Sequence, residues 1–151
     1  MESKSENNIA TLTHLSSLTQ YFIPFGNYIF PIVLWSAKKN ESEYVDYHGK
    51  QVLNFQLSLL VYTIVLVMIA VPAFVISIFK DMPMSTLLHD NNYHLENFNW
   101  EGNAVALTIG LLCILLVIGL KIAEFFLIIY ASIKTSAGQQ FQYPLTIPFI
   151  K

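Results

Sequence analysis

The fold is decided first by a long apolar stretch in the second half of the chain, AVALTIGLLCILLVIGLKIAEFFLIIYASI, residues 104–133. A helix needs about 20 consecutive apolar residues to cross a bilayer, so this stretch is long enough. A second stretch, VLNFQLSLLVYTIVLVMIAVPAFVISIF, covers residues 52–79. As a helix it would rise about 40 Å, more than a hydrocarbon core of about 30 Å, so we expect a tilt or a start outside the core. Both stretches predict membrane-spanning helices.

The composition is that of a membrane protein. Charged residues make up 12% of the chain, against about 25% in a soluble domain, so a surface facing water could not be covered. The 151 residues allow one helical membrane domain, which we expect to occupy residues 1–151. A net charge of −2 and the absence of arginine give no basis for nucleic-acid binding. Because Cys113 is the single cysteine, a disulfide within the chain is excluded, and we expect no metal site and no cofactor.

The first apolar region, residues 9–37, is broken. Pro24, Gly26, Asn27 and Pro31 interrupt it, and proline removes a backbone donor and clashes with the preceding turn. Each half is too short to span a bilayer, so the region is either a single kinked crossing or a re-entrant pair of half-helices. Such a break needs cover from protein or a polar cavity. We therefore predict an all-α integral membrane protein, a small bundle of about three to four helices with a broken first hydrophobic region.

A polar stripe follows the start of the second stretch. Its spacings of three, four and four residues place its members on one helix face. In lipid such a face should point at another helix, as a contact between helices or as the lining of a water path. The stripe consists of Gln51, Asn54, Ser58 and Tyr62.

Two charged residues lie inside the third apolar run. Lys121 and Glu124 are three residues apart, so they share a helix face. Lys121 lies about 20 Å along the helix from Lys134, too deep to be an end residue. An isolated charge in the membrane costs about 3 kcal/mol or more, and a pair offsets part of that cost. The two residues are either a structural ion pair, or a proton or ion relay, or a docking point for a partner helix.

Lysines predict the orientation. Positive residues favour the cytoplasmic side, which places the first connection and the C-terminus there, in a multi-pass protein of the bacterial cytoplasmic (inner) membrane. The acidic loop, residues 81–103, is then outside, and the tail, residues 134–151, is expected to lie along the membrane interface. The N-terminus lies outside if residues 9–37 cross once and inside if they re-enter. The lysines that flank the first connection or follow the last span are Lys38, Lys39, Lys50, Lys134 and Lys151.

Two sets of short motifs lie in the first sixty or so residues and in the last twenty. The first set is His14-Leu15-Ser16, Ile23-Pro24-Phe25-Gly26-Asn27, Pro31, Trp35, Lys38-Lys39, Val45, His48-Gly49-Lys50 and Leu53-Asn54-Phe55-Gln56. The second set is Ile133-Lys134, Gly138 and Tyr143-Pro144-Leu145. Together these motifs resemble the bacterial Tic-twenty-like membrane domain of unknown function, a family named for a subunit of the chloroplast inner-envelope import complex. The resemblance implies a compact helical membrane domain and a role beside a protein-translocation machine, and it carries no catalytic residues.

The sequence favours one class of function over two others. The favoured one is a non-enzymatic accessory or structural subunit of a membrane protein complex, associated with protein translocation or insertion. Its partners would be the lipid bilayer, other integral membrane proteins and, as a further option, copies of itself. The alternative is a small oligomeric channel or transporter that uses the broken region and the Lys121/Glu124 pair as its polar path. An enzyme is disfavoured, because the sequence offers no converging nucleophile and base.

Overall fold

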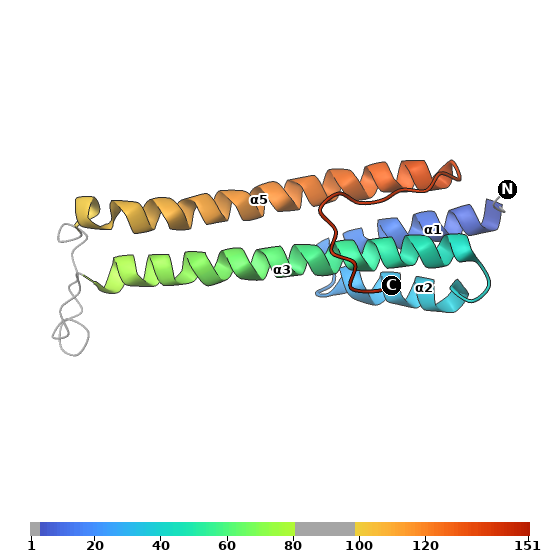
Figure 1. Cartoon of the computed structure of the whole chain (residues 1–151), viewed down its shortest axis with the longest axis horizontal. Helices are drawn as coiled ribbons and strands as arrows, with labels where there is room; N and C mark the ends of the chain where they lie inside the picture. The colour runs from blue at the N-terminus through green and yellow to red at the C-terminus, as the bar shows by residue number, and fades with distance from the viewer. Residues whose placement is uncertain (1–3, 81–98) are drawn as a thin grey trace. The chain divides into compact units, whose positions relative to one another are not determined.

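The computed structural model describes residues 4–80 and 99–151, and these residues form helices and connecting segments without a strand (Figure 1). The predicted all-α class is confirmed. The elements in chain order are α1 (Lys4–Ser16), the 3-10 helix η1 (Ser17–Tyr21), α2 (Gly26–Lys38), α3 (Glu43–Phe79) and α5 (Trp100–Ser136).

The chain divides into two compact units. The first contains residues Met1–Val61 and Leu120–Lys151, and the second contains Tyr62–Gly119. Helices α3 and α5 each contribute residues to both units.

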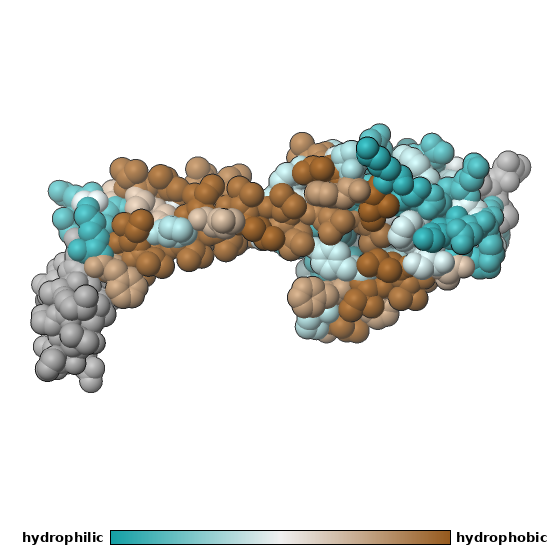
Figure 2. Space-filling view, turned by 60° about the horizontal axis from the view of Figure 1, so that its bottom comes forward, coloured by the Kyte–Doolittle hydropathy of each residue, from teal (hydrophilic) through white to brown (hydrophobic). Residues whose placement is uncertain are grey.

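The second unit pairs the later part of α3 with the earlier part of α5. The two helices approach closely at Gly110, where an added Cβ atom would lie 2.7 Å from Cε2 of Phe74. Outside this contact the unit is covered by exposed apolar side chains, and its visible face is mostly brown in Figure 2. Only 6% and 11% of the most apolar windows of α3 and α5 are buried, so these helices are not the core of a soluble protein. Their apolar surface needs lipid, and the chain is a membrane protein.

The first unit places a helical hairpin against α3 and α5. Helix α1 continues into η1, the chain turns, and α2 runs back and packs against α1 (Figure 1). The break at Pro24 and Gly26 is therefore present, and it is a turn between two half-helices. Phe25 has a left-handed backbone with φ 62°, and an added Cβ on Gly26 would lie 2.5 Å from Oγ1 of Thr19. The tight turn thus requires glycine at position 26.

Pro31 is a correction to the predicted break. It is buried inside α2, and the helix continues past it to Lys38. Proline removes one helical hydrogen bond, and the packing of α2 against its neighbours offsets that loss, because most helix stability in proteins comes from tertiary contacts.

Helix boundaries also differ from the sequence expectation. Residues 81–98 of the predicted outer loop lie outside the described residues, and α5 already begins at Trp100. The reason is a helix cap: Oδ1 of Asn99 accepts a hydrogen bond from the backbone N–H of Gly102 at 2.9 Å. Helix α3 begins at Glu43, where Oγ of Ser42 accepts from the N–H of Val45.

The C-terminal tail packs on α3. Gly138, with φ 74°, ends α5, and the N–H of Gln139 donates to the carbonyl of Lys134 at 3.1 Å, the pattern of a glycine-capped helix end. Tyr143 is buried and stacks on Phe55, with ring centroids 4.0 Å apart. The tail is thus held by the first unit, and its place along the membrane interface stays a prediction.

Candidate functional site: a buried polar core

The interior of the first unit is polar. Burying a polar group costs free energy unless it finds a hydrogen-bond partner, and the cost is high where water cannot substitute. The contacts among these groups therefore decide how the hairpin, α3, α5 and the tail fit together. The fully buried polar side chains include Thr13, His14, Ser17, His48, Gln56, Ser58, Glu124 and Thr135.

Two histidines form the centre of this core. Nε2 of His14 lies 2.9 Å from Nδ1 of His48, and Nδ1 of His14 lies 2.8 Å from the hydroxyl of Tyr143. Oγ1 of Thr135 is 3.4 Å from Nδ1 of His48. The four residues come from α1, α3, α5 and the tail, so this cluster joins four segments that are distant in the chain. We call it the histidine network.

The histidine network has two possible directions. In one, the Tyr143 hydroxyl donates to Nδ1 of His14, and Nε2 of His14 donates to Nδ1 of His48; in the other, Nδ1 of His48 donates to Nε2 of His14, and Nδ1 of His14 donates to the Tyr143 hydroxyl. In both directions Nε2 of His48 lies at the end of the network, where it is buried and has no hydrogen-bond partner among the described residues.

Burial keeps His14 and Tyr143 neutral. Desolvation, and next the neighbouring His48, lower the pKa of His14 well below its ordinary value. Desolvation, and next Glu124, raise the pKa of Tyr143 well above its ordinary value. At neutral pH the His14–Tyr143 contact is thus a hydrogen bond between neutral groups.

The predicted pair of charges forms an ion pair. Nζ of Lys121 lies 2.8 Å from Oε2 of Glu124, and the glutamate side chain is fully buried while 46% of the lysine side chain is exposed. Gln20 of η1 completes the cluster: its Nε2 donates to Oε1 of Glu124 at 2.8 Å, and its Oε1 accepts from Lys121 at 3.3 Å. Sequence reasoning missed Gln20, although an amide inside an apolar region was a usable signal.

Two members of the polar stripe, Asn54 and Ser58, bind the tail, where a contact with another helix or the lining of a water path was expected. Nδ2 of Asn54 donates to the carbonyl of Ile150 at 2.9 Å, and Oδ1 accepts from the N–H of Ile150 at 2.8 Å. Oγ of Ser58 accepts from the N–H of Ile147 at 2.8 Å. An extended tail has peptide groups that need partners, and the stripe supplies them.

The other polar residues that the sequence singled out, Gln51, Tyr62 and Asn27, do not share one set of contacts. Oε1 of Gln51 is buried without a hydrogen-bond partner among the described residues, and Tyr62 belongs to the second unit. Asn27 does face α3, where its Nδ2 donates to Oε1 of Gln56 at 2.7 Å. Asn27 thus joins α2 to α3. Of the stripe, Gln51, Asn54 and Ser58 belong to the first unit and Tyr62 to the second.

A further contact that sequence reasoning missed fastens α2 to α3. Nε1 of Trp35 donates to Oδ1 of Asp46 at 2.8 Å, Asp46 also pairs with Lys50, and Lys39 lies over the Trp35 ring, 4.6 Å from its centroid. The backbone of Gly49 lies against the same ring, so a side chain there would collide with Trp35.

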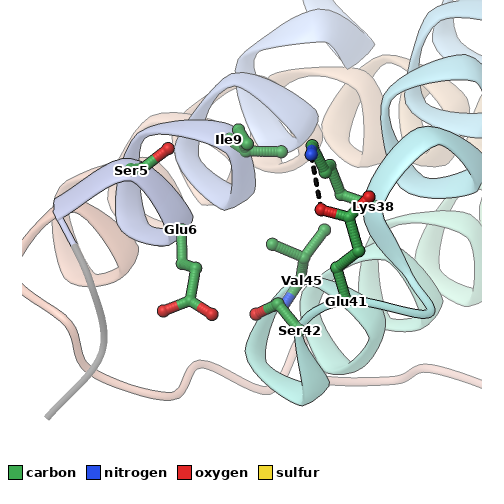
Figure 3. A pocket seen from close by; sticks show the side chains of 7 residues that line it. All are labelled: Ser5, Glu6, Ile9, Lys38, Glu41, Ser42 and Val45. Atoms are coloured by element: carbon green, nitrogen blue, oxygen red, sulfur yellow. Dashed lines mark hydrogen bonds and ion pairs between the residues drawn. The ribbon is translucent and has the colours of Figure 1, made fainter.

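A hollow of about 220 Å³ opens between the start of α1 and the α2–α3 connection (Figure 3). Lys38 and Glu41 form an ion pair at its wall. The lining mixes acid, base and apolar groups, and residues 4–80 and 99–151 contain no cluster of three or more metal-binding side chains. The remaining lining residues are Ser5, Glu6, Ile9, Ser42 and Val45.

Comparison with known proteins identifies relatives at the level of a family. The model of the magnetosome magnetite crystal formation protein family, MamF/MmsF, matches residues 5–150. No curated protein and no solved structure matches the chain.

This match makes the resemblance to the Tic-twenty-like family wrong as an identification. Several of the motif residues on which it rested are buried: His14, His48 and Tyr143 form the histidine network, and Gly49 accommodates Trp35. Such residues determine how a small helical membrane unit packs and do not indicate its function. The match to the magnetite family gives no support to a role in translocation.

Proposed function

We propose that this chain, which belongs to the magnetosome magnetite crystal formation protein family, is a non-enzymatic membrane protein that takes part in magnetite crystal formation. The observation that carries the proposal is the extent of the family match, residues 5–150, which includes both long apolar helices and the whole polar core. The chain would act in the magnetosome membrane, through contacts with lipid and with other integral membrane proteins.

The polar core supports a structural role. Its carboxylate, Glu124, is bound by Lys121 and Gln20, and His14 is bound on both ring nitrogens. Groups held by such contacts fix the positions of the helices. The outer surface of the unit is then fixed as well, as an accessory subunit needs for binding its partners.

Complementation tests this function. The chain would be produced in a magnetite-forming bacterium from which its own members of this family have been deleted, and crystal dimensions would be measured by electron microscopy. We expect the chain to shift the crystal size distribution away from that of the deletion strain. A Ser36→Ala variant, altered at an exposed position of α2, should act like the unaltered chain. Normal amounts in the membrane with crystals unchanged from the deletion strain would contradict the proposal.

A channel or transporter is the second candidate, and one observation favours it: Glu124 is a fully buried carboxylate inside a candidate spanning helix. Ionisable groups at such positions are often functional. Purified protein in proteoliposomes would be tested for proton or ion flux. A flux that survives Glu124→Gln would exclude Glu124 as its relay.

A further inference from the structure

The turn of the α1–η1–α2 hairpin exposes large apolar side chains. Phe22 is 87% exposed and Phe25 is 72% exposed, and Tyr21 and Ile23 beside them are exposed as well. Among the described aromatic side chains of the hairpin, those of Phe22, Phe25 and Tyr21 are the most exposed. In water, such a group of side chains would be strongly unfavourable.

The turn is held rigidly in this form. Hydrogen bonds from the N–H groups of Phe22 and Ile23 to the carbonyl of Thr19, at 3.0 and 2.8 Å, close it. The left-handed backbone of Phe25 and the close approach of Gly26 to Thr19 fix its exit into α2. The exposed aromatics are therefore part of an ordered structure.

Contacts with α5 show the depth at which the turn lies. Gln20 binds Glu124, and the ring of Tyr21 meets the ring of Phe125 edge-on, with centroids 6.4 Å apart. The outward residues of α5 at this level are apolar: Ile122 is 55% exposed and Phe126 is 65% exposed. Because α5 is a candidate membrane-spanning helix, these side chains face hydrocarbon. The turn beside them reaches the same layer.

The opposite end of the hairpin is polar. Helix α1 begins with charged and polar residues at the hollow near Lys38 and Glu41 (Figure 3), and Asn7 lies beside Gly138, which ends α5. Both ends of the hairpin therefore lie at one end of the first unit. Helix α2, with 13 residues, rises about 20 Å, whereas half of a hydrocarbon core is about 15 Å thick. The hairpin is long enough to enter the core and too short to cross it.

We propose that α1, η1 and α2 form a re-entrant hairpin whose turn, residues 21–25, inserts among the acyl chains of a single leaflet. The occupant of this exposed apolar surface is lipid, continuous with the lipid around Ile122 and Phe126 of α5. Gln20 lies behind the turn, where it binds Lys121 and helps to cover the buried Glu124. The start of α1 and the end of α5 then lie on the same side of the membrane. This contact with lipid does not depend on a role in magnetite formation.

Depth-dependent fluorescence tests the insertion. Cys113 is the only cysteine, so Cys113→Ser provides a background in which Phe22→Cys and, as a matched control at the polar end, Ser5→Cys can each carry an environment-sensitive NBD label. In vesicles of phosphatidylcholine and phosphatidylglycerol we expect a blue-shifted emission at position 22. It should be quenched by nitroxides placed deep on the acyl chain and protected from aqueous iodide. Position 5 should show the reverse. Emission and iodide quenching at position 22 equal to those at position 5 would overturn the proposal.

Sidedness provides the second measurement and does not require altering the turn. Ser5→Cys and Gln140→Cys, the latter at an exposed position just after the end of α5, would each be prepared in the Cys113→Ser background and exposed to a membrane-impermeant maleimide in right-side-out and in inverted vesicles. Both positions should react in the same vesicle orientation. Reaction of the two positions in opposite orientations would show a single crossing by the first hydrophobic region and would refute the re-entrant hairpin.

Discussion

The contact between the tail and α3 allows a quantitative prediction. The side-chain amide of Asn54 makes two hydrogen bonds with one peptide unit, at 2.9 Å to the carbonyl and 2.8 Å to the N–H of Ile150. Asn54→Leu removes both bonds while keeping a side chain of similar size. Each such bond contributes about 0.5–1.5 kcal/mol net, so the tail should lose about 1–3 kcal/mol of local stability.

The loss should remain local, because Tyr143 is still buried against Phe55 after the change. A local loss of about 1–3 kcal/mol corresponds to an about 5- to 150-fold increase in opening of the tail. Hydrogen exchange measured by mass spectrometry would report it as faster exchange in the peptide that contains Ile147 and Ile150. The midpoint of global unfolding should change much less.

Gln51→Leu provides the matched control. Gln51 lies one helical turn before Asn54, and its Oε1 has no hydrogen-bond partner among the described residues. The exchange of the tail should therefore be unaltered. Equal tail exchange in the Asn54→Leu variant and the unaltered protein, or equal acceleration by both variants, would refute the assignment of the tail to this contact.

The remaining predictions concern the interior of the first unit. Glu124→Leu leaves Lys121 without its carboxylate partner, and an unpaired charge in a membrane-spanning helix costs about 3 kcal/mol, so the free energy of unfolding should fall by about that amount. The double variant with Lys121→Leu should recover most of that loss in denaturation monitored by circular dichroism in detergent. Gly49→Ala should lower the thermal midpoint in the same assay, because overpacking against Trp35 costs about 1–3 kcal/mol and exceeds the roughly 1 kcal/mol that alanine gains over glycine in a helix. The pKa of His14 is lowered in the folded state, so as the pH falls the unfolded chain takes up a proton at this residue before the folded chain does. The contribution of His14 to the free energy of unfolding should therefore be complete above about pH 6.5 and be lost as the pH falls from there toward the folded-state pKa. His14→Gln should flatten this part of the stability–pH curve, and an unchanged slope would contradict the assignment.

Local patterns predicted those features that depend on neighbouring residues. The apolar stretches indicated α3 and α5, and the three-residue spacing of Lys121 and Glu124 indicated an ion pair, which the structure contains. The turn near Pro24 and Gly26 followed from the conformational limits of proline and glycine.

The features that sequence reasoning missed join residues that are distant in the chain. His14 lies 34 residues from His48 and 129 residues from Tyr143, and no periodicity connects such positions. The same limit explains the error about the polar stripe. Its spacing showed that Asn54 and Ser58 share a face, but a spacing cannot tell whether that face meets a helix or an extended tail.

The contact between Asn54, Ser58 and the tail also imposes an order on biosynthesis. Ile147, whose N–H binds Ser58, follows it by 89 residues in the chain, and Ile150 follows Asn54 by 96 residues. Until these residues are synthesised, the side chains of Asn54 and Ser58 in α3 have no tail to bind. The first unit can reach its final form only after the nascent chain has delivered residue 150, so the contact between α3 and the tail forms after α5 has been made.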